Sequence, residues 1–568
     1  MGFQLSPGVA VSEIDLTTVV PSVSTTAGAF AGTFQWGPAN KIILVDSEIT
    51  LSKIFGTPDS NSAVSFFTAA NFLAYGNNLS VVRAVGTNTF NADANTAGAN
   101  IQVANKDVFQ YTLLTSNNNN VYGPFMARYA GALGNDLSVS VCANTASFSS
   151  WAYSSYFPSA PTTSSYVSGL GGSNDELHIV VIDTNGSFSG SKGTVLETFP
   201  FVSKALDAVN LNDGSSNYYK QVIFNNSKYI YAVDPVDYAN TSSTWGTSSA
   251  GKNFATSNTT FAYNLSGGVT DTVTDANKLG AFELFANKEY IDIDLIITGD
   301  ASPILQQGII DNVVGVRQDC VAFVSPRQVD VVNQSGLEIS NIQNWLNTLS
   351  RSSTYAVADS GWKYQFDMYN NTYRWIPLNA DVAGLCVYTD SITDPWFSPA
   401  GLNRGAIKNA IKLAWNPAKT YRDSLYSAGV NAVVSFPGQG IVLWGDKTLT
   451  VKPSAFDRIN VRRLFIALEK AISKAAQYSL FELNDDFTRA QFVSLVSPFL
   501  RDVQGRRGIV DFKVVCDTTN NTPNVIDSNQ FVGDIYIKPA RSINYIQLNF
   551  VAVGTGVDFN TIVGQATV

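Results

Sequence analysis

The sequence predicts an α+β multidomain protein: an α/β core assembled from N- and C-terminal segments, one or more inserted β-rich outer domains, and extended arms at both ends. Its 568 residues correspond to about three or four domains at roughly 100–200 residues per domain. A composition of 45% hydrophobic and 12% aromatic residues can build sizeable cores and excludes a mostly disordered chain. Helix-like and strand-like segments alternate on either side of residues 87–270, whereas that stretch combines short strands with loops.

Residues 1–22 are expected to form an N-terminal arm. A short β-prone stretch follows the Pro7-Gly8 break, and Pro21 closes it. This stretch is too short to form a sheet alone. It is therefore either an edge strand of its own domain or a strand that pairs with another molecule.

The core begins with residues 23–86. Residues 29–34 have the composition of a strand, residues 62–75 place apolar side chains at helical spacing before Gly76, and residues 79–85 predict a second strand. We expect this compact segment to form the first part of the core.

Residues 87–270 differ in character from the rest of the chain. Ser, Thr, Asn and Gly dominate the loops, and short strands such as residues 137–141 and 178–182 lie between them. This pattern predicts a β-rich, solvent-facing insertion, formed either by one domain or by two nested domains.

An α/β rhythm returns in residues 271–400. Helix candidates cover residues 276–288 and 304–317, and strand candidates cover residues 291–297 and 320–324. Because alternating helices and strands favour an open, largely parallel sheet, we expect this domain to continue the core.

Residues 401–550 contain the clearest helix of the chain. The segment Ser454-Ala455-Phe456-Asp457 is typical of a helix start. Apolar side chains then recur at helical spacing: Val461, Leu464, Phe465, Leu468, Ile472, Ala475 and Ala476. Arg463, Lys470 and Lys474 fall on the opposite side at about 100° per residue, where the default interpretation is a solvated helix face.

The remaining C-terminal elements are expected to be a second helix and three strands. The helix covers about residues 485–503, and Pro498 inside it predicts a kink. The strands are expected at residues 509–516, 535–537 and 543–553, and residues 551–568 are expected to form a C-terminal arm.

Charge is distributed unevenly along the chain. The net charge is −9, but the residues from Gly401 onward carry 19 Lys and Arg against 13 Asp and Glu, and the residues before it carry 17 against 32. The C-terminal third is therefore +6 and the rest −15. This asymmetry predicts an acidic partner. An acidic protein surface is favoured over nucleic acid, because no run of basic residues is interleaved with aromatic ones and no nucleic-acid motif is recognisable.

The sequence contains few of the residues that commonly form catalytic or metal sites, with one histidine and four cysteines. His178 is the single histidine, which excludes multi-histidine metal sites, and we interpret it as structural. The four cysteines are far apart without a Cys-x-x-Cys pair, which indicates reduced core residues folded in a reducing cytoplasm. We therefore expect no catalytic residue, cofactor or metal. No apolar run reaches about 18 residues, and the N-terminus does not resemble a secretory signal, so we expect no membrane insertion.

Several phrases of the sequence resemble the tail sheath proteins of contractile-tailed bacteriophages. The phrases are Ala383-Gly384-Leu385-Cys386-Val387-Tyr388-Thr389-Asp390, Ser398-Pro399-Ala400-Gly401, Ala428-Gly429-Val430-Asn431, Val442-Leu443-Trp444-Gly445-Asp446-Lys447-Thr448-Leu449, Ile459-Asn460-Val461-Arg462-Arg463-Leu464-Phe465, Phe481-Glu482-Leu483-Asn484 and Val515-Cys516-Asp517. N-terminal counterparts are Ser6-Pro7-Gly8-Val9 with Glu13 and Gly32-Thr33-Phe34-Gln35-Trp36-Gly37-Pro38. Together they cover about half of the chain, and their order and spacing make the resemblance specific.

The resemblance implies a structural virion protein of the phage tail that is assembled in the host cytoplasm. Sheath subunits of this family form hexameric rings stacked in a helical lattice around a tail tube, between a baseplate and a tail terminator. Contraction from a metastable extended state drives the tube through the host envelope. Neighbouring subunits exchange terminal arms as added strands, a mode that fits short β-prone ends. The implied arm residues are Val9, Val11, Glu13, Ile14, Leu16, Val551, Val553, Val557 and Phe559.

The same resemblance places residues 401–550 toward the tube. Because this region is the basic one, Arg463, Lys470 and Lys474 become candidates for contacts with the tube protein. The alternative interpretation remains a solvated helix face.

Two other function classes remain open from the residues alone. The Ser/Thr/Asn-rich insertion would also suit a receptor-binding or adhesive virion protein. Asp292 and Asp294 share one face of a predicted strand, so a carbohydrate-active enzyme with paired carboxylates is a third possibility.

Overall fold

The computed structural model describes residues 23–95, 100–114, 121–237, 244–256 and 259–547. The chain divides into two compact units, with the boundary between Glu482 and Leu483. The arm residues expected from the sequence, at positions 1–22 and 551–568, lie outside the described residues.

An eight-stranded sheet forms the centre of the first unit. Its strand order is β17-β16-β12-β11-β10-β1-β3-β2. The strands are β1 (Gly28–Gly32), β2 (Ile43–Val45), β3 (Leu79–Arg83), β10 (Leu295–Ile297), β11 (Val321–Val324), β12 (Ala356–Asp359), β16 (Val430–Phe436) and β17 (Gly440–Trp444). All neighbours from β16 to β3 are parallel, and the two edge strands are antiparallel. The predicted open, largely parallel sheet is confirmed.

The sheet joins segments that are far apart in sequence. Gly28 of β1 pairs with Leu79 of β3 on one side and with Leu295 of β10 on the other. β16 and β17 extend the same sheet, so the domain boundary that we placed at residue 401 does not coincide with a structural one. The reason is that β12 pairs directly with β16 across the intervening segment.

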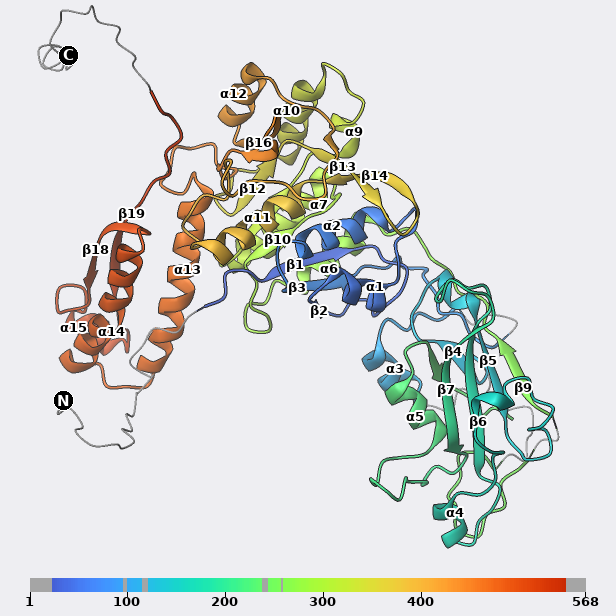
Figure 1. Cartoon of the computed structure of the whole chain (residues 1–568). Helices are drawn as coiled ribbons and strands as arrows, with labels where there is room; N and C mark the ends of the chain where they lie inside the picture. Colours follow the sequence, from blue (N-terminus) through green and yellow to red (C-terminus); the bar gives the residue numbers. More distant parts are fainter. Residues whose placement is uncertain (1–22, 96–99, 115–120, 238–243, 257–258, 548–568) are drawn as a thin grey trace, which may run out of the picture. The chain divides into compact units, whose positions relative to one another are not determined.

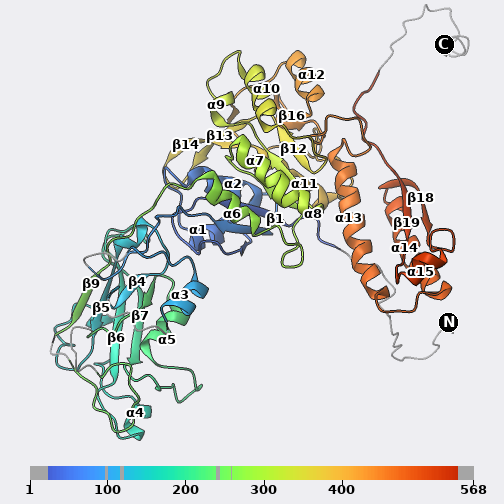
Figure 2. The same cartoon turned by 180° about the vertical axis from the view of Figure 1, so that it is seen from behind.

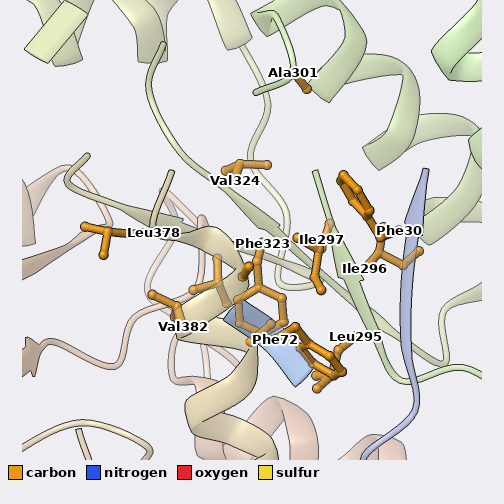
Figure 3. Packing of buried hydrophobic residues seen from close by; sticks show 14 of the residues in the cluster. Phe30, Phe72, Leu295, Ile296, Ile297, Ala301, Phe323, Val324, Leu378 and Val382 are labelled. Carbon is orange, nitrogen blue, oxygen red and sulfur yellow. The ribbon is translucent and has the colours of Figure 1, made fainter. Parts of the chain in front are cut away.

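Helices surround this sheet and bury its apolar residues. They are α1 (Glu48–Phe55), α2 (Ala63–Leu73), α6 (Asp275–Glu283), α7 (Pro303–Ile309), α8 (Gly315–Arg317), α9 (Gln328–Val331), α10 (Glu338–Leu349), α11 (Asn379–Ile392), α12 (Lys419–Ser427) and α13 (Ile459–Ala476). A π-helical turn at Ile310–Val314 joins α7 to α8. Figure 3 shows Phe72 of α2 and Val382 of α11 beside Phe323 of β11 in the core that these elements share.

Two pieces of the first unit lie outside the central sheet. The first is a small antiparallel sheet of β13 (Trp362–Asp367), β14 (Thr372–Pro377) and β15 (Lys412–Leu413) in the order β14-β13-β15. The second is the insertion.

The described residues of the insertion form two antiparallel sheets, which confirms the prediction of a β-rich region. Its elements are α3 (Lys106–Thr112), β4 (Phe125–Ala127), β5 (Leu137–Cys142), α4 (Ser165–Gly169), β6 (Glu176–Asp183), β7 (Thr194–Ser203), α5 (Tyr219–Asn226), β8 (Ile230–Ala232) and β9 (Phe261–Asn264). The larger sheet has the order β7-β6-β5-β9, and the smaller pairs β4 with β8. α3 and α5 lie next to each other in both views (Figure 1, Figure 2), where Phe109 and Phe224 stack at 6.0 Å.

A buried arginine marks the point where the chain leaves the sheet for the insertion. The Arg83 guanidinium, at the end of β3, donates to the carbonyl oxygens of Phe34, Gln35 and Gly37 and to that of Ala130 in the insertion, at 2.7–3.2 Å. Four carbonyl acceptors satisfy a charged group that would otherwise be costly to bury.

The described part of the second unit, residues 483–547, contains two helices and a two-stranded sheet. The elements are α14 (Asp486–Gly505), β18 (Ile509–Val515), α15 (Pro523–Asp527) and β19 (Asp534–Pro539), and Pro498 lies inside α14. The strand expected at residues 543–553 is not found in its described part, because residues 540–547 contain no strand. The predicted helix start at Ser454 is also wrong: α13 begins at Ile459 after Arg458, while Ser454 Oγ accepts only from the Phe456 amide in the preceding loop.

Candidate functional site: contacts between helix α13 and the arm root

The candidate site is the region where α13 meets residues 23–27, which we call the arm root because they connect the N-terminal arm to β1. The apolar side of α13 is buried as its periodicity predicts, with Val461, Leu464 and Leu468 each below 3% exposed. The other side of the helix is also partly buried. Arg463 and Lys470 on that side form ion pairs with carboxylates of the core.

Arg463 forms a two-pronged ion pair with Asp390 of α11. Its Nη1 donates to Asp390 Oδ1 at 2.9 Å and its Nη2 to Oδ2 at 2.6 Å, and both side chains are about 95% buried. The arm root joins this pair through Thr25, whose Oγ1 donates to Asp390 Oδ2 at 2.5 Å and whose carbonyl oxygen accepts from Arg463 Nη2 at 3.2 Å. Planar bidentate pairs of this kind fix orientation as well as charge.

Lys470 lies about two turns further along α13 and binds the segment that precedes β10. Its Nζ donates to Asp294 Oδ1 at 2.6 Å, to Asp292 Oδ1 at 2.7 Å and to the Ile293 carbonyl oxygen at 2.8 Å. The arm root takes part again, because the Ala27 amide donates to Asp294 Oδ2 at 3.1 Å. Lys474 forms an ion pair with Asp292 at 3.3 Å, and both side chains are nearly half exposed.

The pKa shifts follow from burial and from these partners. Burial raises the pKa of Asp294 to about 6, although the charge of Lys470 opposes the rise. Burial also acts to raise the pKa of Asp292, but hydrogen bonds and charge from Lys470 and Lys474 outweigh it and the pKa is lowered. For Lys470, the two carboxylates outweigh the desolvation of its ammonium group, and its pKa is raised.

The arrangement connects three parts of the chain through two carboxylates. Asp390 binds both Thr25 and Arg463, and Asp294 binds both Ala27 and Lys470. The arm root is therefore held to α13 both directly, by the hydrogen bond from Arg463 to the Thr25 carbonyl oxygen, and through shared acceptors of the core. A displacement of either partner disturbs the hydrogen bonds of the other.

This geometry corrects the solvated-face interpretation of the helix. Arg463 and Lys470 do not lie on an exposed basic stripe: their side chains are 4% and 8% exposed, and each is neutralised within the chain. Lys474 is the member of the three that is half exposed. The reason for the error is that the carboxylates come from α11 and from the segment before β10, which wrap the polar side of the helix.

Asp292 and Asp294 are structural partners of Lys470 rather than a pair open to a substrate, since Asp294 is 96% buried by its side chain and hydrogen-bonded to the arm root. His178 is equally structural. Its Nδ1 accepts from the Phe201 amide at 3.1 Å, which leaves the proton on Nε2 facing the Ser159 carbonyl oxygen at 2.9 Å, and burial lowers its pKa.

The described residues contain no group of three or more His, Cys, Asp or Glu side chains placed to hold a metal ion. The four cysteines are buried and unbridged. Within the same residues, no helix combines the length and the apolar character that crossing a membrane requires.

Sequence reasoning missed Asp390 and Thr25 as members of the site. Asp390 lies 73 residues before Arg463 in sequence, and the carbonyl of Thr25 lies 438 residues before it. No local pattern marks such a pairing. The arm residues expected from the sequence lie outside the described part of the chain: Val9, Val11, Glu13, Ile14, Leu16, Val551, Val553, Val557 and Phe559.

Three protein-family models match the chain. They are the phage tail sheath protein central domain over residues 271–449, the phage tail sheath C-terminal domain over residues 451–552, and the N-terminal region of domain III of the tail sheath protein Gp18 over residues 25–84. The central-domain match includes the carboxylates Asp292, Asp294 and Asp390 of the candidate site. The Gp18 domain III match includes the arm root from Thr25 onward.

Full-length relatives and solved structures agree with these matches. The chain is 36% identical to a tail sheath protein of Vibrio phage KVP40 over 99% of this chain and 100% of the relative, and 33% identical to that of Enterobacteria phage T4 over 99% of each. A sheath tail protein from Listeria innocua has a similar fold, with a TM-score of 0.53 at 12% identity over 91% of this chain and 96% of that one. The helical sheath protein of the anti-feeding prophage in its contracted state gives a TM-score of 0.51 at 12% identity over 97% and 99%.

Proposed function

Since the chain belongs to the family of phage tail sheath proteins, we propose that its copies stack as hexameric rings in a helical lattice around a tail tube and shorten that lattice to drive the tube through the host envelope. The chain is a contractile tail sheath subunit and a component of the virion tail. The observation that carries the proposal is the 36% identity to a tail sheath protein across 99% of the chain.

In this proposal the energy for contraction is stored in the lattice. It requires two packings of unequal free energy that are separated by a barrier, and no nucleotide. The mechanism assigns no catalytic residue, cofactor or metal to the chain. A head-to-tail contact that does not close generates a helical array, so one contact type suffices to stack the rings.

We propose that the terminal arms connect neighbouring subunits by strand addition. The acceptor is the sheet of the second unit, in which β18 and β19 pair with each other and with no other described strand. A two-stranded sheet is marginal by itself, and its free edges offer unpaired backbone donors and acceptors to an added strand. Arms at 1–22 and 551–568 with alternating apolar residues such as Val9 and Val11 would supply such strands.

The contacts of the arm root give this connection a mechanical role. A neighbour that holds the arm would pull on Thr25 and Ala27, which share Asp390 and Asp294 with α13. The pull would therefore reach α13, the last α-helix before the boundary at Glu482.

We further propose that residues 401–550 face the tube and residues 87–270 face outward, with the baseplate and the tail terminator at the two ends of the lattice. Lys474 keeps the tube-facing role that we inferred from the sequence, because its ammonium group is half exposed. Arg463 and Lys470 do not have this role in the proposal, because each forms a buried ion pair within the subunit.

The experiment that tests the proposal compares polymerisation of the full chain with that of a chain lacking residues 1–20. Electron microscopy and sedimentation should show hollow tubes or ring stacks for the full chain. The shortened chain should keep the far-ultraviolet circular dichroism of the parent and remain in the supernatant, because the arm contributes to neighbours and not to its own core.

A matched pair of point variants controls for arm length. Val11→Pro removes a backbone donor from the arm and should block polymerisation, whereas Val11→Thr keeps both the donor and the β-propensity and should not. Polymerisation of the shortened chain, or loss of its folding, would contradict strand exchange by the N-terminal arm.

A further inference from the structure

The small sheet β14-β13-β15 buries polar side chains on one face and leaves the aromatic side chains of its other face partly exposed. Its register pairs Tyr364 with Trp375 and Phe366 with Tyr373, so these four side chains share one face, which we call the aromatic face (Figure 1 shows the hairpin). A sheet with one solvated face normally has the opposite arrangement, with apolar side chains inward.

The inward polar residues of this sheet are fully engaged. Lys363 Nζ donates to Asp381 Oδ1 at 2.8 Å with both side chains completely buried. Gln365 accepts a hydrogen bond from the Asn71 side chain at 2.8 Å. Because breaking a buried ion pair is costly, these contacts fix the register and hold the aromatic face outward.

The aromatic face is preorganised. The ring of Tyr364 lies 4.7 Å from that of Trp375 and 5.5 Å from that of Tyr373, and the rings of Phe366 and Tyr373 are 5.2 Å apart. Lys412 of β15 places its Nζ 4.9 Å from the centre of the Tyr364 ring. Phe366 and Tyr373 are nevertheless 45% and 51% exposed in the single subunit. The result is a rigid apolar patch bordered by a cation.

We propose that the aromatic face is an interface with a second copy of this chain. Ordered aromatic side chains supply large contact area at low entropic cost, and contiguous exposed patches of this type mark interaction sites. The choice of occupant follows from charge: the Lys412 ammonium, which lies over the Tyr364 and Trp375 rings, favours an acidic partner, and the residues before Gly401 of each copy carry 32 Asp and Glu against 17 Lys and Arg. The inference rests on the proposed polymerisation and adds to it a contact that is independent of the arms.

The test is a double substitution, Phe366→Thr with Tyr373→Thr, in the full chain. Threonine keeps the β-propensity of both positions, and neither side chain contributes to the buried polar contacts, so the subunit should fold with unchanged circular dichroism. Loss of two clustered aromatic side chains should raise the critical concentration for polymerisation at least about tenfold. Lys412→Glu should raise it as well, and more strongly at low salt than at high salt.

Tyr290→Thr is the matched control, because Tyr290 is a more exposed tyrosine, at 86%, outside the aromatic face. Its critical concentration should equal that of the parent chain. If the parent polymerises and the double variant does so at the same concentration, the inference is wrong while the proposed function stands. Normal polymerisation combined with loss of tube binding would also overturn it, because the face would then contact the tube. Failure of the parent itself to polymerise would instead contradict the proposed function.

A photo-cross-linking amino acid at position 373 gives a positive readout that does not depend on loss of assembly. Irradiation of the assembled protein should yield covalent dimers of the chain, with the cross-link mapping to a peptide from the acidic part of the second copy. The same residue placed at position 290 should yield few dimers. Absence of dimers from position 373 in well-formed polymers would refute the assignment.

Discussion

Replacing Lys470 by methionine should destabilise the first unit in a strongly pH-dependent way. Methionine fills a similar volume but leaves Asp294, which is 4% exposed by its side chain, without its cation. Asp292 is 44% exposed and can be solvated instead, so Asp294 determines the response. A double variant that also carries Asp294→Asn removes the buried charge altogether.

The expected magnitude follows from the pKa of Asp294, which is about 6 in the folded chain. At about pH 5 this carboxyl is mostly protonated with or without Lys470, so the variant loses mainly hydrogen bonds, worth about 1 kcal/mol. Above about pH 6 the parent ionises Asp294 beside Lys470, whereas the variant must keep it protonated at a cost of about 1.4 kcal/mol per pH unit. The loss in the free energy of unfolding should therefore grow to about 2.4 kcal/mol at pH 7 and about 4 kcal/mol at pH 8.

The sign of this dependence follows from the direction of the shift. The folded pKa of Asp294 is raised above its value in the unfolded chain, so its contribution to stability is complete below about pH 4 and is lost as the pH rises through the folded pKa. Removal of Lys470 raises the folded pKa further. The variant therefore goes on losing stability with rising pH beyond the point at which the parent stops losing it.

Urea unfolding followed by tryptophan fluorescence measures this effect on one unit alone, because all nine tryptophans precede Leu483. Lys474→Met is the matched control: its pair with Asp292 is half exposed, so it should cost less than about 1 kcal/mol at any pH. The free energy of unfolding of the Lys470→Met, Asp294→Asn double variant should change little between about pH 5 and about pH 8, because the buried carboxyl is gone. If Lys470→Met lowered the free energy of unfolding by the same amount at both ends of this pH range, the reasoning would be wrong.

Two further predictions concern the tube contact and the core. The Lys474→Met chain should bind isolated tail tube more weakly than the parent, with a smaller salt dependence, in co-sedimentation; unchanged binding would remove Lys474 from the interface. Gly384→Ala should destabilise the first unit by about 1–3 kcal/mol in the same urea assay, because the new methyl would lie 2.3 Å from Tyr75 Cδ2 between α11 and α2. Gly280→Ala in α6, where no atom lies within 4 Å of the added Cβ, should instead stabilise the unit by up to about 1 kcal/mol, and a loss there would show that the contrast is not steric.

The helices and strands of the core could be predicted from local patterns. The apolar period starting at Val461 predicted α13, which ends at Ala476 as expected. The strand predicted at residues 79–85 is β3, which ends two residues earlier at Arg83. These elements are specified by burial periodicity, a property of neighbouring residues.

The polar contacts could not be predicted in the same way. The partners of Lys470 lie at least 176 residues away in sequence, so the pattern on α13 could not distinguish a solvated lysine from a buried one. A clearer signal existed for the small sheet, which we did not predict. Residues 362–367 and 372–377 alternate in character around Asn370-Asn371, and Asn371 has a φ of 49°, as asparagine in a hairpin turn often does.

Arg83 has a consequence for how this protein can diversify. Its guanidinium binds three carbonyls of the sheet's own loop and one of the segment that departs from it, and Trp36 of the same loop packs against Tyr129 and Phe188 of the insertion. The parts of the insertion that do not contact this loop can consequently change in length or sequence while the junction keeps its contacts. Such a junction would allow the inserted domain to diverge between related chains while the eight-stranded sheet and its helices stay the same.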